Sequence, residues 1–165
     1  MDHSDLPKNK LPKFNPVHWL SLGFGSGLIP KAPGTFGTLV GIPVVFLLAQ
    51  LTWWGYLLAL VVMTVAGIWI CQYTAKAMGV HDHPSIVWDE IVGYAIAMFA
   101  LPVEPFWLVA AFILFRILDI WKPGPIGWAD KQLEGGNGII MDDVLAGVFS
   151  AALLHLGWWL SGLLG

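Results

Sequence analysis

Cysteine and charge are both scarce in this sequence. Among its 165 residues Cys71 is the single cysteine, and charged residues make up only 12%. One cysteine excludes an internal disulfide or a cysteine-rich metal site, and its place in an apolar run suits core packing. The charged fraction is about half of the roughly 25% of ordinary soluble domains. No basic surface suits nucleic acid, and no protein partner is predicted.

Apolar residues take the place of the missing charge. They form 57% of the chain, and the mean hydropathy is +0.72, which predicts an integral membrane protein. The length predicts a single domain over residues 1–165, with a polar N-terminal tail at 1–14. No compact apolar region with a small-residue cleavage site follows that tail, so we expect no cleaved signal peptide.

The apolar residues gather in five segments, which predict an all-α, polytopic membrane helix bundle of about five transmembrane or re-entrant helices. A straight helix needs about 20 residues to cross the hydrocarbon core, so only the second and fifth segments cross comfortably. Glycines and Pro43 in the first segment allow a kink, and four spans plus one re-entrant segment is the alternative. The segments are Phe36 to Leu51, Trp53 to Cys71, Ile91 to Leu101, Phe106 to Trp121 and Val144 to Leu160.

The basic residues predict the orientation. In the five-span arrangement all of them fall on one side, which the positive-inside rule makes cytoplasmic, together with the N-terminus. The opposite connections are short and contain only Glu104, so we expect function at the cytoplasmic face and the C-terminus outside. The basic residues are Lys8, Lys10, Lys13, Lys31, Lys76, Arg116, Lys122 and Lys131.

Two pairs of acids stand beside the apolar segments. Asp89 and Glu90 are expected to open the third helix, and Asp142 and Asp143 the fifth. Either pair alone could cap free backbone amides and complement the helix dipole. Both pairs face one compartment beside Asp119, however, and such a cluster repels itself unless a cation lies among the carboxylates. Oxygen-rich sites of this kind suit Mg²⁺.

The segment RILDIWKP places a cation, an acid and a second cation along one helical stripe, as Arg116, Asp119 and Lys122. Such charges are costly against lipid, so they are expected to face the bundle or an aqueous cleft. One interpretation is a structural Arg116–Asp119 ion pair with Lys122 reaching toward the interface. In the other, Arg116 and Lys122 hold a phosphate while Asp119 binds a metal.

Two further stretches are candidates for the site. The glycine-rich stretch GFGSGLIPKAPGTFGT, residues 23–38, cannot be helical throughout, and its amides could cradle an anion with Gly34 and Thr35 contacting substrate. Alternatively it is a flexible entry to the first span. The segment VHDHPS carries His81 and His83, which could ligate a softer metal or belong to an ordinary turn.

These segments carry a resemblance to a known family. The stretches GFGSGLIPKAPGTFGT, VHDHPSIVWDEIVG, FRILDIWKPGPIGWAD and GGNGIIMDDVLAG resemble the phosphatidylglycerophosphatase A family of bacterial inner-membrane lipid phosphatases. The resemblance implies Mg²⁺-dependent hydrolysis of phosphatidylglycerophosphate to phosphatidylglycerol and phosphate, in phospholipid biosynthesis. It also implies a multi-pass protein of the bacterial inner membrane, with its active site on the cytoplasmic side.

The site residues follow from matching motif positions. We expect a Mg²⁺ site for one or two ions, a phosphate clamp of Arg116 and Lys122 with Gly34 and Thr35, and His81, oriented by Asp82, as general acid or base. Asp130 also matches the motif, whereas Lys31 does not. Attack by water is the default, and an aspartyl-phosphate is the alternative. The expected metal ligands are Asp89, Glu90, Asp119, Asp142 and Asp143, and Asp89, Asp119 and Asp143 are also expected to be catalytic.

Two other functions stay open at this point. Intramembrane charges also mark small cation or proton transporters, although the charges here gather at one face without a polar stripe to the other. A lipid head-group phosphotransferase that uses a nucleotide-activated lipid is the second alternative.

Overall fold

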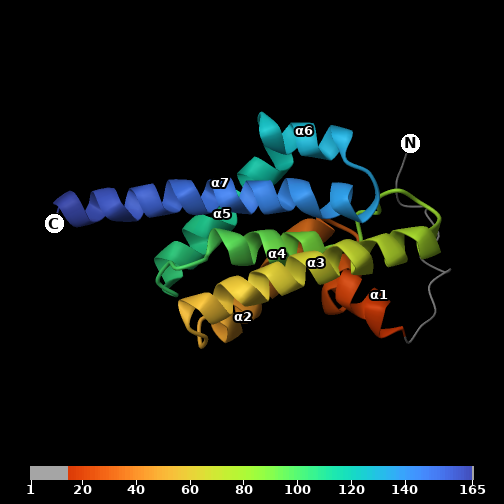
Figure 1. Ribbon diagram of the computed structural model, residues 1–165, viewed down its shortest axis with the longest axis horizontal. Coiled ribbons are helices and arrows are strands. Elements are labelled where there is room, and N and C mark those ends of the chain that lie inside the picture. The colour runs from red at the N-terminus through yellow and green to blue at the C-terminus, as the bar shows by residue number, and fades with distance from the viewer. Residues whose placement is uncertain (1–14, 165) are drawn as a thin grey trace.

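The computed structural model describes residues 15–164, with side chains through Leu160, and the polar tail predicted at 1–14 lies outside the described residues. Every regular element in the described part is helical, which confirms the all-α prediction. Figure 1 shows α3, α4 and α7 running roughly along the long axis of the molecule, with α7 extending furthest. The elements are α1 (Pro16–Ser21), the 3-10 helix η3 (Gly23–Leu28), α2 (Pro33–Leu48), α3 (Trp53–Met78), α4 (Trp88–Ala97), α5 (Pro105–Trp121), α6 (Pro125–Gln132) and α7 (Gly135–Leu164).

Two helices are long and apolar enough to cross a membrane: α3, and α7 over Gly135–Leu160. The Thr52 side chain caps α3 by accepting from Gly55 N at 3.2 Å, and Gly79, at φ 74°, ends it. At 26 residues α3 is about 39 Å long, more than the hydrocarbon core of about 30 Å. These helices indicate membrane association, whereas five crossings and the orientation stay predictions. Exposed apolar residues along α5 also suit contact with lipid, for example Phe106, Val109 and Ile113.

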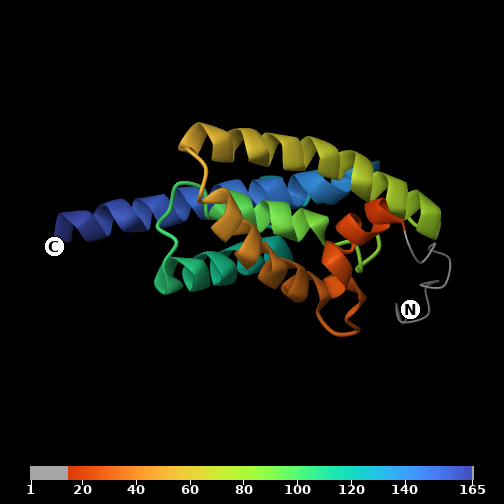
Figure 2. The same cartoon turned by 90° about the horizontal axis from the view of Figure 1, so that it is seen from below.

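The shortest of the predicted spans, α4, forms the centre of the bundle. Figure 2 shows it between α3 on one side and α2 and α5 on the other, and it also packs along α7. Ile91, Val92 and Tyr94 are fully buried. With 10 residues α4 is only about 15 Å long. Because other helices surround α4, its ends do not face lipid, and it need not be long enough to span the hydrocarbon core.

Glycines let α4 and α7 approach closely. A side-chain carbon at Gly147 would collide with the Gly93 carbonyl oxygen and lie 3.0 Å from Ile96 Cβ. A carbon at Gly93 would lie 2.8 Å from the Asp143 carbonyl oxygen. The two backbones therefore touch beside the acids, and this contact fixes Asp89 and Glu90 relative to Asp142 and Asp143.

The last helix begins earlier than predicted. It starts at Gly135 rather than near Val144, so Asp142 and Asp143 lie about two turns inside it and do not open it. The segment GGNG, residues 135–138, belongs to this helix. A side-chain carbon at Gly136 would collide with the Ile68 carbonyl oxygen, so this glycine allows α7 to pack against α3.

A short helix that the sequence did not predict, α6, follows α5. It begins with Pro125 at its first position, where a proline is well tolerated, and it buries Ile126 and Ala129. It packs against α7 and is seen above that helix in Figure 1. Helix α6 thus brings Asp130 to the charged end of the bundle.

Candidate active site

A polar cavity of about 220 Å³ lies at the charged end of the bundle, where α2, α4 and α7 begin and α5 ends. Of the charged residues that the structure describes, only Glu104, before α5, lies at the opposite end. The cavity gathers residues that are up to 111 positions apart in the sequence, from Ala32 to Asp143. Its walls consist of Ala32, Pro33, Gly34, Asp82, His83, Pro84, Ile86, Asp89, Glu90, Arg116, Asp119, Lys122, Ile139, Asp142 and Asp143.

The five acids predicted as metal ligands all lie in this cavity, and they form two overlapping groups. Asp89 and Glu90 in the first turn of α4 meet Asp143 of α7, with one carboxylate oxygen from each within 4.8 Å of the others. Asp119 of α5 and Asp142 meet Asp143 in the same way. Asp143 belongs to both groups. For Asp142 and Asp143, a position inside α7 removes the helix-capping alternative.

Electrostatics indicates what these acids could hold. Six carboxylates line the cavity against the cations Arg116 and Lys122. Two like charges 4 Å apart at an effective dielectric constant near 20 repel each other by about 4 kcal/mol. Among the described residues, Asp89 Oδ1, Glu90 Oε2 and Asp142 Oδ1 are buried without a hydrogen-bond partner. Buried, unpartnered carboxylate oxygens in two close groups are a donor set that fits hard divalent cations such as Mg²⁺.

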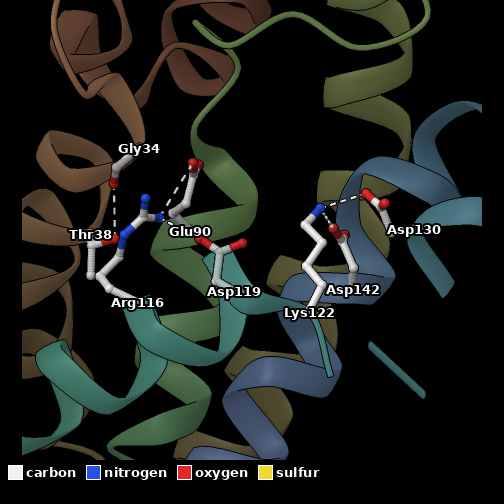
Figure 3. A network of polar contacts seen from close by, with 8 residues as sticks. All are labelled: Gly34, Thr38, Glu90, Arg116, Asp119, Lys122, Asp130 and Asp142. Atoms are coloured by element: carbon white, nitrogen blue, oxygen red, sulfur yellow. Dashed lines mark hydrogen bonds and ion pairs between the residues drawn. The ribbon is translucent and has the colours of Figure 1, made fainter. Parts of the chain in front are cut away.

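Arg116 is held between acids from two helices. Its Nη1 donates to Asp119 Oδ2 at 2.5 Å and lies 3.8 Å from Glu90 Oε1, as Figure 3 shows. The structural ion pair considered for the RILDIWKP segment is therefore present. Arg116 Nε is buried and has no partner within the described part of the chain. The guanidinium thus lies in the cavity wall with donor capacity left for a bound oxyanion.

Lys122 lies just past the end of α5 and pairs with two acids instead of extending alone to the interface. Its Nζ donates to Asp130 Oδ1 at 2.5 Å and to Asp142 Oδ2 at 2.6 Å (Figure 3). Partial burial opposes the charge, but the hydrogen bonds and negative charges of Asp130 and Asp142 outweigh it and raise the pKa of Lys122 above its ordinary value. Lys122 therefore stays cationic. Sequence reasoning noted Asp130 but gave it no role, because α6 was not expected.

The start of α2 forms the wall opposite α7. Ala32 precedes it in a left-handed conformation, at φ 53°, and Gly34 borders Arg116. The Thr38 hydroxyl donates to the Gly34 carbonyl oxygen at 2.9 Å, as seen in Figure 3. Gly34 lies where a substrate contact was predicted. Thr35 is not among the wall residues, and its contact with substrate stays a prediction.

The loop between α3 and α4 places its two histidines differently. His81 lies outside the cavity wall, and its Nε2 accepts from Gly135 N at 3.1 Å, at the start of α7. Asp82 and His83 line the cavity. His83 Nδ1 accepts from Ser85 N at 3.1 Å, so the neutral ring carries its proton on Nε2. The predicted acid–base role of His81 stays a prediction, and its observed partner is backbone.

This fold and site define a class: an all-helical, membrane-associated protein with an acid-rich, phosphate-compatible site at one end of its bundle. The model of the phosphatidylglycerophosphatase A family matches residues 19–158. The chain belongs to this family and is an enzyme of the phosphatase class, which confirms the resemblance noted in the sequence.

Named relatives support the assignment. Phosphatidylglycerophosphatase A of Escherichia coli K12 is 49% identical over 154 residues, covering 93% of this chain and 90% of the relative. Phosphatidylglycerophosphatase A of Haemophilus influenzae is 46% identical over 157 residues, covering 93% and 96%. A protein of Bacteroides thetaiotaomicron with the provisional name phosphatidylinositol-3-phosphatase is 40% identical over 161 residues, covering 93% and 99%. No solved structure matches the chain.

Proposed function

We propose that this protein hydrolyses the phosphomonoester of phosphatidylglycerophosphate, giving phosphatidylglycerol and inorganic phosphate, with Mg²⁺ as its cofactor, in phospholipid biosynthesis. The observation that carries the proposal is the cavity in which two acid groups share Asp143 beside Arg116 and Lys122. The two phosphatidylglycerophosphatase A relatives support the substrate.

The acids would hold the cation, as Asp89, Glu90 and Asp143 on one side and Asp119, Asp142 and Asp143 on the other. Magnesium bound there supplies positive charge that offsets the charge of the phosphate oxygens and orients the reacting groups. The carboxylates are held in fixed positions, because the contact between the α4 and α7 backbones sets the spacing between the acids of the two helices.

The basic residues bind and orient the phosphate. Arg116 offers a planar set of N–H donors, and Lys122 offers a compact cation fixed by Asp130 and Asp142. A dianionic phosphomonoester would meet both cations while its ester oxygen faces the lipid. Holding the phosphate in line with its attacking group is the main contribution of such a site.

We propose that water attacks the phosphorus atom. We assign the transfer of protons during the reaction to the loop between α3 and α4, through the Asp82 carboxylate. Cys71 is fully buried in an apolar cluster and is not among the residues that line the cavity, so it is not a nucleophile for this site. Asp82 lines the cavity and is exposed, which suits exchange of protons with solvent.

We further propose a multi-pass arrangement in the bacterial inner membrane with the cavity at the cytoplasmic face. The concentration of charged residues at the cavity end of the bundle supports this orientation. Membership of a phosphatase family favours hydrolysis over the transporter and phosphotransferase alternatives.

The test is phosphate release by the detergent-purified protein from phosphatidylglycerophosphate, with phosphatidic acid and phosphatidylinositol 3-phosphate as competing substrates. We expect release that requires Mg²⁺, stops with chelator and falls about a hundredfold or more in Asp143→Asn. Glu104→Gln removes an acid at the far end of α5 and serves as the matched control, with wild-type rates expected.

Each outcome has a separate meaning. Release that persists in chelator, or a near-normal Asp143→Asn, would overturn the metal assignment. Faster release from phosphatidylinositol 3-phosphate would overturn the substrate but not the reaction. No release from any of the three lipids would overturn the phosphatase proposal.

A further inference from the structure

A second, apolar groove of about 200 Å³ lies next to the polar cavity, between the end of α5, the link to α6, and α7. Its lining is Leu118, residues 123–126, Phe149 and Leu153. Two of these residues are direct chain neighbours of cavity residues, since Leu118 precedes Asp119 and Pro123 follows Lys122. The groove and the cavity are therefore built in part from the same stretch of chain around the end of α5.

Helix α7 links the two spaces along one face. Asp142, Ala146, Phe149 and Leu153 follow the spacing of four, three and four residues that places side chains on the same side of a helix. Asp142 lines the polar cavity, Ala146 is buried, and Phe149 and Leu153 line the groove. The eleven positions from Asp142 to Leu153 span about 16 Å. That is close to half of the hydrocarbon core of about 30 Å, the depth of one leaflet.

The groove is open on its lipid side and flanked by interfacial aromatic residues. Phe149 and Leu153 are 41% and 51% exposed, whereas Ile126 beneath them is buried. Trp121 at the end of α5 and Trp128 on α6 are both largely exposed. Tryptophan side chains favour the level of the lipid head groups, which places the end of α5 and the link to α6 at that level.

We propose that this groove binds one acyl chain of the phosphomonoester lipid whose head group occupies the polar cavity. The inference rests on the proposed function and adds a subsite to it. Lys122 supplies a cation for the phosphate at the head-group end, and Leu118, Phe149 and Leu153 supply apolar contact, with Leu153 about 16 Å along α7 from Asp142. A lipid could then enter sideways from the bilayer and keep its tail in an apolar environment.

A larger apolar groove, of about 500 Å³ between α3, α4 and α7, is the competing place for the chain. Trp88 blocks the end of this groove that faces the cavity. Its indole Nε1 donates to the Met63 carbonyl oxygen at 3.1 Å, and its ring packs over Gly67 next to Ile140. A chain in this groove would be separated from the phosphate site by packed side chains.

Two residues of α7, five positions apart, give a matched pair of variants. Leu153 lines the proposed groove and Val148 lines the competing one, and their exposures are 51% and 49%. Leu153→Trp should lower kcat/KM about tenfold for a substrate with two palmitoyl chains and leave a substrate with two hexanoyl chains nearly unchanged. Val148→Trp should leave both unchanged. Equal loss on both substrates in Leu153→Trp, or a loss confined to long chains in Val148→Trp, would overturn the proposal.

A second measurement does not depend on turnover or on a folded variant. Wild-type protein in bilayers is irradiated with phosphatidylglycerophosphate that carries a diazirine in one acyl chain, and labelled residues are mapped by mass spectrometry. We expect labels in residues 118–126 together with Phe149 and Leu153. Labels in residues 57–65 of α3, or even labelling of the whole lipid-facing surface, would overturn the groove assignment. Failure of the proposed function would instead appear as wild-type protein that cleaves neither substrate.

Discussion

Lys122 combines a functional side chain with an unfavourable backbone. It ends α5 in the left-handed region, at φ 49° and ψ 54°, where glycine is usual. This conformation costs a residue with a Cβ about 1 kcal/mol. The turn it makes directs Nζ to Asp130 and Asp142. Because this strained position carries a lysine and not a glycine, we attribute the backbone cost to the two ion pairs that its ammonium makes.

Two variants separate the charge from the strain. Lys122→Gly and Lys122→Ala both remove the ammonium and are expected to lose most phosphatase activity. The glycine variant should be more stable than the alanine variant by about 1 kcal/mol, a difference of about 2–4 °C in Tm. Thermal unfolding in detergent measures the difference. Equal stability of the two variants would show that Lys122 carries no strain.

Gly34 is predicted to be essential without contributing a side chain. A Cβ there would lie 3.1 Å from both Nη atoms of Arg116 and would overlap Glu90 Oε1. Gly34→Ala should displace the guanidinium and lower kcat/KM about tenfold to a hundredfold with little change in Tm. Gly157→Ala, whose Cβ meets nothing within 4 Å, is the control for the kinetics. Wild-type kinetics in Gly34→Ala would contradict a fixed Arg116 position.

At the residue scale, the sequence predicted correctly which acids lie together. It did not predict the conformation of the loops beside them. The five acids gather because each stands beside an apolar run that ends at the same side of the bundle. His81 was assigned by its matching motif position and Thr35 as a donor in the glycine-rich stretch, and both roles stay predictions. Ala32, in a left-handed conformation, precedes the first turn of α2, and the backbone N–H of Gly135 donates to His81. No local sequence pattern predicts either feature.

At the scale of elements, the contact between α4 and α7 positions the site. The Gly93 and Gly147 backbones touch, and the Phe115 ring of α5 packs against Gly93. This contact fixes the distance between the acids of the two helices, which their metal-binding geometry requires.

Two glycines of α7, Gly147 and Gly157, are expected to respond to the same substitution with opposite sign. Gly147→Ala adds a Cβ that collides with the Gly93 carbonyl oxygen, and we expect a loss of about 1–3 kcal/mol of stability. Gly157→Ala adds a Cβ in open space and should gain up to about 1 kcal/mol from helix propensity. Thermal unfolding of both variants in the same detergent is the measurement. A stabilised Gly147→Ala would show that the helices pack less closely than described.

The elements show where sequence patterns were misleading. All five apolar segments form helices. This prediction succeeded because the length of an apolar run can be read from the segment alone, without knowledge of its tertiary contacts. The glycines of GGNG and the prolines and glycines around α6 are also turn residues, so these segments were not predicted to be helical. Contacts with α3 and α7 decided their structure instead, through Gly136 against Ile68 and Ile126 against α7.

At the scale of the whole molecule, the described charges other than Glu104 lie at the cavity end of the bundle. The hydrophobic surface between the ends is broad, with exposed apolar side chains on α3, α5 and α7. Composition alone predicted this surface and the membrane association. It did not determine the number of crossings, because α4 is surrounded by protein and need not reach membrane length.

Cysteine labelling in intact cells tests the orientation. Glu104→Cys should react with a membrane-impermeant maleimide from outside the inner membrane, and Lys131→Cys only after that membrane is permeabilised. Wild-type protein supplies the background, because Cys71 is fully buried and should stay unlabelled. The reverse pattern of labelling would place the cavity outside the cytoplasm and contradict the proposed localisation.

The close backbone contacts at Gly93, Gly136 and Gly147 also affect how mutational data on this family would be interpreted. In a saturation library selected for activity, these positions should be as intolerant of replacement as Asp119 or Asp143, although they carry no chemistry. Exposed positions such as Leu58 and Ile120 should accept most apolar residues. Catalytic groups would therefore stand out by a different criterion: their variants keep normal protein abundance while losing activity, whereas glycine variants at the backbone contacts lose abundance as well.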